Sequence, residues 1–116
     1  MIRLSESTTK SMVVKKQFSS FQELLDGSNL PVLVDFYATW CGPCQIMAPI
    51  LEQVGTYLKD QVQIVKIDGD KYPNLASEYR VQAFPTLILF KKGQVVNRIE
   101  GVVQAQQLIQ HLQSLL

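Results

Sequence analysis

The stretch that decides the fold is VLVDFYATWCGPC, residues 32–44, in which an apolar run leads into two closely spaced cysteines. Residues 32–37 are mostly apolar and partly β-branched, and Pro31 precedes them, which is typical of a strand buried on both faces. Asp35 is the one charge inside this run. From Pro43 to Lys59 apolar residues recur at the spacing of an amphipathic helix. The cysteines therefore lie where a buried strand passes into a helix.

Two prolines shape that helix. Pro43 fits its first turn, where a backbone amide proton would have no partner inside the helix. Pro49 lies further in and predicts a kink, because its ring meets the carbonyl group four residues earlier. We therefore expect one helix that begins at the cysteines and bends along its length.

The remaining elements follow from apolar spacing and turn residues on either side of this stretch. Upstream, Ser20–Glu23 has the pattern of a capping box that opens a short helix, which Gly27 ends, and Val13-Val14 indicates an edge strand. Downstream, a tight turn at Lys92-Gly93 joins two strands into an antiparallel hairpin. The expected downstream strands are residues 62–68, 86–90 and 95–99, with a short helix at 74–79. A final amphipathic helix is expected near the C-terminus, with an apolar face of Leu108, Ile109, Leu112, Leu115 and Leu116 and a polar face that includes Gln104, Gln106 and Gln107.

This order of elements places the chain in the α/β class. Helices separate the early strands and a hairpin comes late, which predicts a central mixed β-sheet of four to five strands flanked by four helices, on both faces. A length of 116 residues suits one domain. We expect residues 1–12 to be a flexible N-terminal extension and residues 13–116 to form the domain.

Composition excludes several classes of function. Eleven Lys and Arg against ten Asp and Glu leave a net charge of +1, which argues against an electrostatic surface for nucleic acid or an anionic membrane. The apolar runs at residues 30–36 and 87–90 are too short to cross a bilayer. Residues 1–17 contain no apolar stretch of the kind that a secretory signal needs. We therefore expect a reducing compartment, the cytoplasm or its organellar equivalent.

The cysteine pair, Cys41 and Cys44, admits three interpretations. A structural zinc site needs four ligands, and beyond the two thiols the chain offers only His111. A purely structural disulfide that closes so short a loop would stabilise the fold by only about 2 kcal/mol. A reversible redox pair fits best, because residues i and i+3 of a first helical turn share a face. The free amides and positive dipole end of the helix would stabilise a Cys41 thiolate. Cys44 lies one turn deeper and is better placed to resolve the mixed disulfide than to attack first.

The sequence around the pair resembles the active-site signature of the thioredoxin family. The signature is WCGPC at residues 40–44, preceded by VDFYA at residues 34–38, and the similarity runs from about Val13 to Leu116. Within it, DFYAT at 35–39 and KID at 66–68 followed by KYP at 71–73 are similar to the y-type thioredoxins of cyanobacteria and plastids. Further matches are Pro49, Lys66, Phe84-Pro85-Thr86, Gly93 and Gly101.

The resemblance implies a role for each matching residue of the redox site. Cys41 would be the attacking thiolate and Cys44 the resolving thiol. Asp35 would take and return the proton of the resolving cysteine, with Lys66 as its partner. A carboxylate in an apolar strand should independently have a raised pKa, which suits proton transfer near neutrality. The alternative is that Asp35 lies on an exposed strand edge.

The resemblance also implies a docking surface for target proteins. Trp40 belongs to it and, with Gly42-Pro43, forms the active-site loop. Pro85 matches a cis-proline that faces the disulfide. For Trp40 the alternative is plain core packing. One departure from the family pattern concerns this surface, since Gly69 stands where an apolar residue often contributes, which puts that contact in doubt. The complete expected docking set is Trp40, Ala83, Phe84, Pro85 and Gly101.

We therefore expect a thioredoxin-type electron carrier that reduces protein disulfides and needs no cofactor or metal beyond its Cys41–Cys44 disulfide. Gly-Pro between the cysteines resembles the reductant subclass. The implied partners are a ferredoxin- or NADPH-dependent thioredoxin reductase and targets such as peroxiredoxins and methionine sulfoxide reductases. We expect a monomer in the cytoplasm, or in the plastid stroma of a eukaryote. The alternatives are a thioredoxin-fold binding module and an oxidative-folding catalyst of the periplasm or endoplasmic reticulum.

Overall fold

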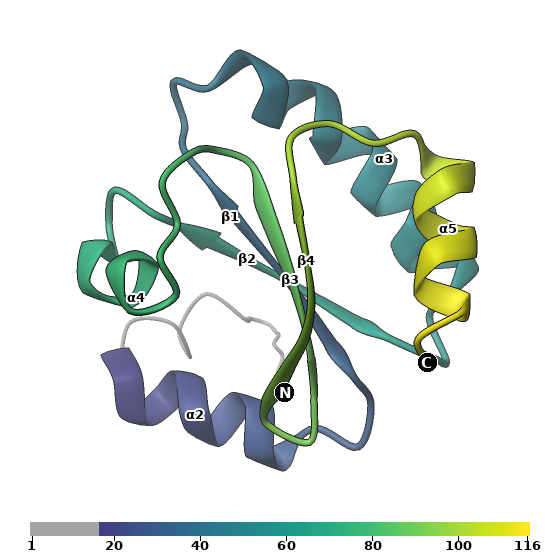
Figure 1. Cartoon of the computed structure of the whole chain (residues 1–116), viewed down its shortest axis with the longest axis horizontal. Coiled ribbons are helices and arrows are strands. Elements are labelled where there is room, and N and C mark those ends of the chain that lie inside the picture. The colour runs from purple at the N-terminus through teal and green to yellow at the C-terminus, as the bar shows by residue number, and fades with distance from the viewer. Residues whose placement is uncertain (1–16) are drawn as a thin grey trace.

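The chain forms a four-stranded mixed sheet in the order β2-β1-β3-β4, as the computed structural model shows for residues 17–116 (Figure 1). Strand β1 pairs in parallel with β2 and antiparallel with β3, and β3 pairs antiparallel with β4. The elements are α2 (Gln17–Gly27), β1 (Val32–Tyr37), α3 (Gly42–Tyr57), β2 (Gln63–Asp68), α4 (Pro73–Glu78), β3 (Thr86–Lys91), β4 (Gln94–Glu100) and α5 (Ala105–Gln113).

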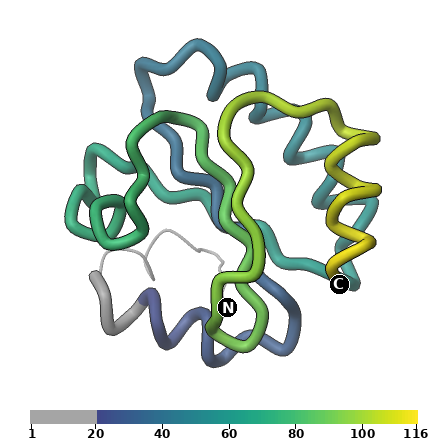
Figure 2. Tube along the Cα trace, in the orientation of Figure 1, coloured from purple at the N-terminus to yellow at the C-terminus, as the bar shows by residue number. Residues whose placement is uncertain are grey.

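The sheet separates two apolar cores, each closed by a pair of helices (Figures 1 and 2). Helices α2 and α4 cover one face, where Phe21 and Leu75 pack with Val34 and Phe36 of β1. Helices α3 and α5 cover the other face, where Leu33 of β1 is buried. Because alternate residues of a strand point to opposite faces, Asp35 faces the same side as Leu33, toward α3.

The predicted architecture is confirmed. The structure contains a mixed sheet of four described strands with helices on both faces. Positive φ angles at Lys92 and Gly93 form the tight turn of the β3–β4 hairpin, and α3 continues through Pro49. Within residues 17–116, no helix combines the length and apolar character needed to span a bilayer.

The prediction of a capping box at Ser20 is wrong. Helix α2 begins at Gln17, so Ser20 lies inside the helix and not at its N-cap. The three preceding residues, Gln-Phe-Ser, include neither proline nor glycine, and therefore nothing in the backbone stops the helix from starting earlier. The strand expected at Val13-Val14 and the extension expected at residues 1–12 lie outside the described residues.

Candidate active site

The two cysteines are held at the start of α3. Cys41 is the N-cap residue, in extended conformation, and its Sγ accepts a hydrogen bond of 3.1 Å from the backbone amide of Cys44. The two side chains form a disulfide, with their Cα atoms 5.3 Å apart. The first sulfur thus lies among the unpaired amides and the positive dipole end of a helix. When the bond is reduced, these groups favour the thiolate of Cys41 over its thiol.

The segment before β3 faces this disulfide. The Phe84–Pro85 peptide bond is cis, as the resemblance implied, and the carbonyl oxygen of Phe84 lies 3.5 Å from Cys41 Sγ. Thr86, at the start of β3, is fully buried, and its hydroxyl donates to the carbonyl oxygen of Ala83 at 2.7 Å. That bond closes the segment into a tight turn beside the cysteines.

Asp35 is a buried carboxyl group at the centre of the sheet. Its side chain is 2% exposed, and Oδ1 has no hydrogen-bond partner among the described residues. Loss of hydration raises the pKa of Asp35 from its ordinary value of 3.8 to about 6, against a smaller opposite effect of the Lys66 charge. The alternative of an exposed strand edge is wrong, because β1 lies between β2 and β3. A carboxyl with such a pKa can both accept and return a proton near neutral pH.

Lys66 lies directly across from Asp35 in the parallel register of β1 and β2. Its ammonium group lies over the ring of Tyr37, 4.8 Å from the ring centroid. Among the described residues these two side chains form no ion pair, so Lys66 acts on Asp35 through its charge and not through a direct bond. The predicted partnership is therefore electrostatic.

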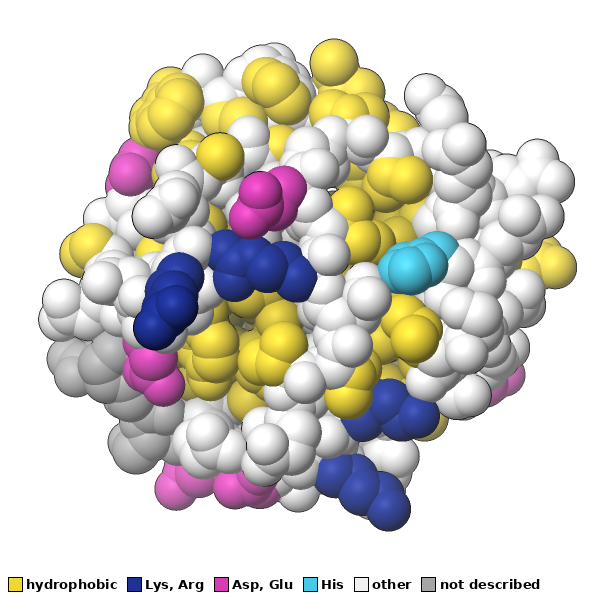
Figure 3. All heavy atoms as spheres, viewed as in Figure 1, with side chains coloured by type: hydrophobic (Ala, Val, Ile, Leu, Met, Phe, Trp, Pro, Cys, Tyr) yellow, Lys and Arg dark blue, Asp and Glu magenta, His cyan; other side chains and the backbone are white. Residues whose placement is uncertain are grey.

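The expected docking residues gather around the disulfide. Trp40 is 70% exposed, which excludes plain core packing, and its ring meets that of Phe84 edge-on, with centroids 5.9 Å apart. Gly101 donates its amide proton to the carbonyl oxygen of Pro85 at 3.0 Å. Ala83 is exposed beside them. Apolar side chains reach the surface at this end of the molecule, at the top of Figure 3, over the loop that leads into α3.

Asp70 is a site residue that the sequence analysis missed. Its Oδ2 accepts a hydrogen bond of 2.6 Å from the indole Nε1 of Trp40. Asp68 holds the turn in place, because its Oδ1 accepts from the backbone amides of Asp70 and Lys71 at 2.9 and 3.3 Å. An available signal was the acidic pair Asp68 and Asp70, at and just after the end of β2, since the ends of parallel neighbours such as β1 and β2 meet at one edge of a sheet.

No group of three or more His, Cys, Asp or Glu side chains that could hold a metal ion occurs in the part of the chain that the structure describes. His111, the only histidine of the sequence, is exposed on α5 and pairs with Asn97 Oδ1 at 2.8 Å.

Comparison with known proteins assigns this geometry to a family. A family model described as thioredoxin matches residues 12–114. A thioredoxin-like protein of Synechocystis sp. is 69% identical over 102 residues, covering 88% of this chain and 97% of that protein. Thioredoxin Y1, chloroplastic, of Arabidopsis thaliana is 54% identical over 107 residues, covering 91% of this chain and 62% of that longer protein.

A solved structure agrees with these sequence matches. It belongs to a study of thiol resolution in yeast mitochondrial 1-Cys peroxiredoxin by the glutathione and thioredoxin systems. The solved chain superposes on the present protein with a TM-score of 0.76 at 36% sequence identity. The match covers 84% of the present protein and 90% of the solved chain. The y-type resemblance of the active-site region is supported by the chloroplastic relatives. The chain belongs to the thioredoxin family, whose members exchange electrons with reductases and target disulfides, and it is a protein dithiol–disulfide oxidoreductase.

Proposed function

We propose that this chain works as a reductant of protein disulfides, with Cys41 as the nucleophile and Cys44 as the resolving thiol. The observation that carries this assignment is the position of Cys41 Sγ at the N-cap of α3, 3.1 Å from the amide nitrogen of Cys44. Among the described residues, Cys41 is the one of the two sulfurs that accepts a hydrogen bond. An ionised sulfur is the species that attacks a disulfide.

The reaction proceeds by two thiol–disulfide exchanges. The Cys41 thiolate attacks one sulfur of the target disulfide, a mixed disulfide forms, and the second target sulfur leaves as a thiolate that takes up a proton. Cys44 then loses its proton and attacks the sulfur of Cys41, which releases the first target sulfur. Two electrons pass from the protein dithiol to the target, and the Cys41–Cys44 disulfide is formed.

Asp35 takes the proton from Cys44 in the second exchange. The support for this role is that Asp35 faces the α3 side of the sheet, is buried, and has a pKa raised to about 6 by loss of hydration. Within residues 17–116 Oδ1 has no hydrogen-bond partner, so it can accept a proton directly or through water. Lys66, across the register on β2, favours the ionised carboxylate through its positive charge.

Turnover with insulin tests this function. With dithiothreitol as the electron donor, the protein should precipitate reduced insulin chains several-fold faster than dithiothreitol alone. The competing function is a binding module with incidental cysteines, and such a protein would give no acceleration.

The direction of electron flow is tested by the reduction potential. Gly42-Pro43 separates the cysteines, without the histidine usual in oxidants and isomerases, and we therefore expect a value near the −270 mV of thioredoxin, to within about 30 mV. Equilibration with mixtures of reduced and oxidised dithiothreitol, followed by trapping of free thiols, measures it. A potential above about −200 mV would assign the chain to the oxidising or isomerising class instead.

The partners follow from the same similarity. We propose a ferredoxin-dependent thioredoxin reductase as the electron donor, in preference to the NADPH-dependent type, because the relatives include chloroplastic y-type thioredoxins. Peroxiredoxins and methionine sulfoxide reductases are the proposed targets, and a solved relative comes from work on a peroxiredoxin. The protein acts as a monomer in the cytoplasm, or in the plastid stroma if its source is a eukaryote.

A further inference from the structure

Gly69 lies against the ring of Phe84, at the turn that follows β2. A methyl group on Gly69 would lie 2.5 Å from Cε1 and 2.6 Å from Cζ of that ring, closer than nonbonded carbon atoms can approach. The next nearest atom, the carbonyl oxygen of Tyr37, would be at an ordinary 3.6 Å. The backbone of Gly69 is not in the left-handed region. A side chain at this position would therefore have to displace one aromatic ring, and the backbone conformation does not itself disfavour it.

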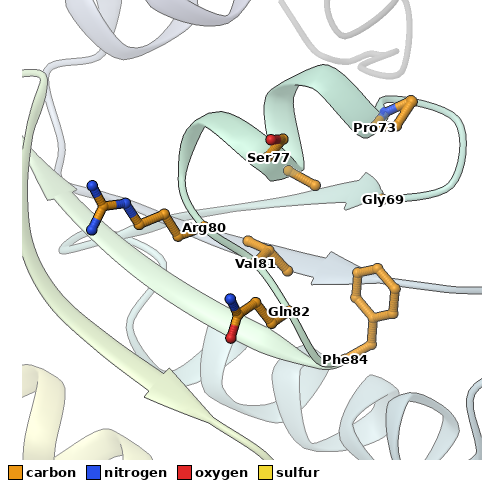
Figure 4. Close-up of a pocket in the computed structure, with 8 residues that line it drawn as sticks. Gly69, Pro73, Ser77, Arg80, Val81, Gln82 and Phe84 are labelled. Atoms are coloured by element: carbon orange, nitrogen blue, oxygen red, sulfur yellow. The ribbon is translucent and has the colours of Figure 1, made fainter.

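The ring of Phe84 links three parts of the docking surface. The ring meets Trp40 edge-on, and the backbone carbonyl oxygen of the same residue lies 3.5 Å from Cys41 Sγ. It also lines an open groove of about 550 Å³ between α4 and the segment that leads to β3. Figure 4 shows the ring projecting from that segment toward the turn at Gly69, with Pro73 and Ser77 of α4 also lining the groove.

We infer that Gly69 is a specificity-determining residue for target binding, because its missing side chain lets the Phe84 ring lie where it forms the apolar surface between Trp40 and the groove. The inference rests on the proposed function and extends it. Indole Nε1 already donates to Asp70, so the paired rings offer a target apolar area and no free N–H donor. The surface therefore suits a target whose disulfide is flanked by an apolar side chain.

The Gly69→Ala variant tests this inference. Displacement of the Phe84 ring should raise KM for insulin, with a loss in kcat/KM of about tenfold, as expected when one apolar contact is removed. The rate with 5,5′-dithiobis(2-nitrobenzoate), a small disulfide that needs no docking surface, should change less than about twofold, and the reduction potential should stay unchanged. Gly27→Ala is the matched control, since a methyl group there meets no atom within 4 Å, and it should leave all three measurements unchanged.

A second variant separates the contact from a general effect on folding. Phe84→Leu removes Cε1 and Cζ, the two ring atoms that a methyl group on Gly69 would meet. In this background Gly69→Ala should therefore cost less than about twofold in kcat/KM for insulin, against about tenfold in the wild-type background, a coupling that a double-mutant cycle isolates. If Gly69→Ala alone does not fold, Gly69→Ala/Phe84→Leu should still fold and should match Phe84→Leu.

Three results would overturn the inference. These are an unchanged KM for insulin in folded Gly69→Ala, an equal loss with the small disulfide, and the same or a larger penalty for Gly69→Ala in the Phe84→Leu background. None of them concerns the exchange chemistry. Failure of the proposed function would be visible separately, as a wild-type protein that does not accelerate insulin reduction.

Discussion

Cys41→Ser should abolish insulin reduction, with a loss of about 10³-fold or more, whereas Cys44→Ser should lose turnover and accumulate mixed disulfides with target proteins. The reason is the asymmetry of the two sulfurs, since Cys41 at the N-cap accepts the amide hydrogen bond that stabilises a thiolate. Without Cys44, the mixed disulfide formed by Cys41 has no neighbouring thiol to resolve it. Non-reducing electrophoresis of the two variants after exposure to a cell extract, next to the insulin assay, measures both effects.

The double variant Cys41→Ser/Cys44→Ser is the control, because it keeps the fold and the docking surface but has no sulfur that can be captured. It should trap nothing. Equal trapping by Cys41→Ser and Cys44→Ser would contradict the assignment of roles. Trapping by Cys41→Ser alone would reverse it.

Asp35→Asn should remove a large pH dependence of stability. The pKa of the buried carboxyl is about 6 in the folded protein, against an ordinary 3.8, so between these values the folded state holds a proton that the unfolded state has released. Stability must therefore fall as pH rises from about 4 to about 6 and stay lower above it. The values differ by about two pH units, and one unit corresponds to about 1.4 kcal/mol, which gives a loss of about 3 kcal/mol in the wild type.

Urea unfolding of the oxidised protein at pH 4, 6 and 8 checks this. The free energy of unfolding of Asp35→Asn minus that of the wild type should increase by about 3 kcal/mol from pH 4 to pH 8. Asp60→Asn, which changes an exposed carboxylate after α3, is the control and should run parallel to wild type. If the unfolding free energies of Asp35→Asn and the wild type changed equally with pH, the raised pKa of Asp35 would be contradicted.

The same variant should be slower in catalysis. Without a carboxyl group to accept the proton of Cys44, resolution of the mixed disulfide should slow by about tenfold or more at pH 7. The rate of the first attack should change little, because the amide of Cys44 and the helix dipole remain. Stopped-flow measurement of the two exchanges separates these steps, and an effect on the first attack alone would contradict the role of Asp35.

Much of the fold could be predicted because its signals are local. A continuous apolar run, a 3.6-residue spacing and a turn at Lys92-Gly93 each report on neighbours in sequence, and the strands and helices they predict are present. The buried position of Asp35 was equally readable, from its apolar neighbours. The start of α2 was not, because a capping pattern at Ser20 does not exclude a helix that begins one turn earlier at Gln17.

The missed features of the site are long-range contacts. The Trp40–Asp70 hydrogen bond joins residues 30 positions apart, and it depends on two parallel strands ending at the same level of the sheet. The contact of Gly69 with Phe84 depends on a side-chain orientation, and the position of the Lys66 ammonium over Tyr37 does so as well. Spacing along the chain carries no direct record of such contacts, so the sequence could place Gly69 only as a departure from the family pattern.

The strand order β2-β1-β3-β4 has a consequence for the protein during its synthesis. A ribosome makes the cysteines early, but β3, which pairs with β1 and brings the carbonyl oxygen of Phe84 to Cys41, comes more than 40 residues later. Gly101, which binds the carbonyl oxygen of Pro85, comes later still. A nascent chain released only as far as α3 would therefore carry two thiols and Trp40, without the rest of the proposed docking surface. That surface is complete only after β4 and Gly101 have emerged.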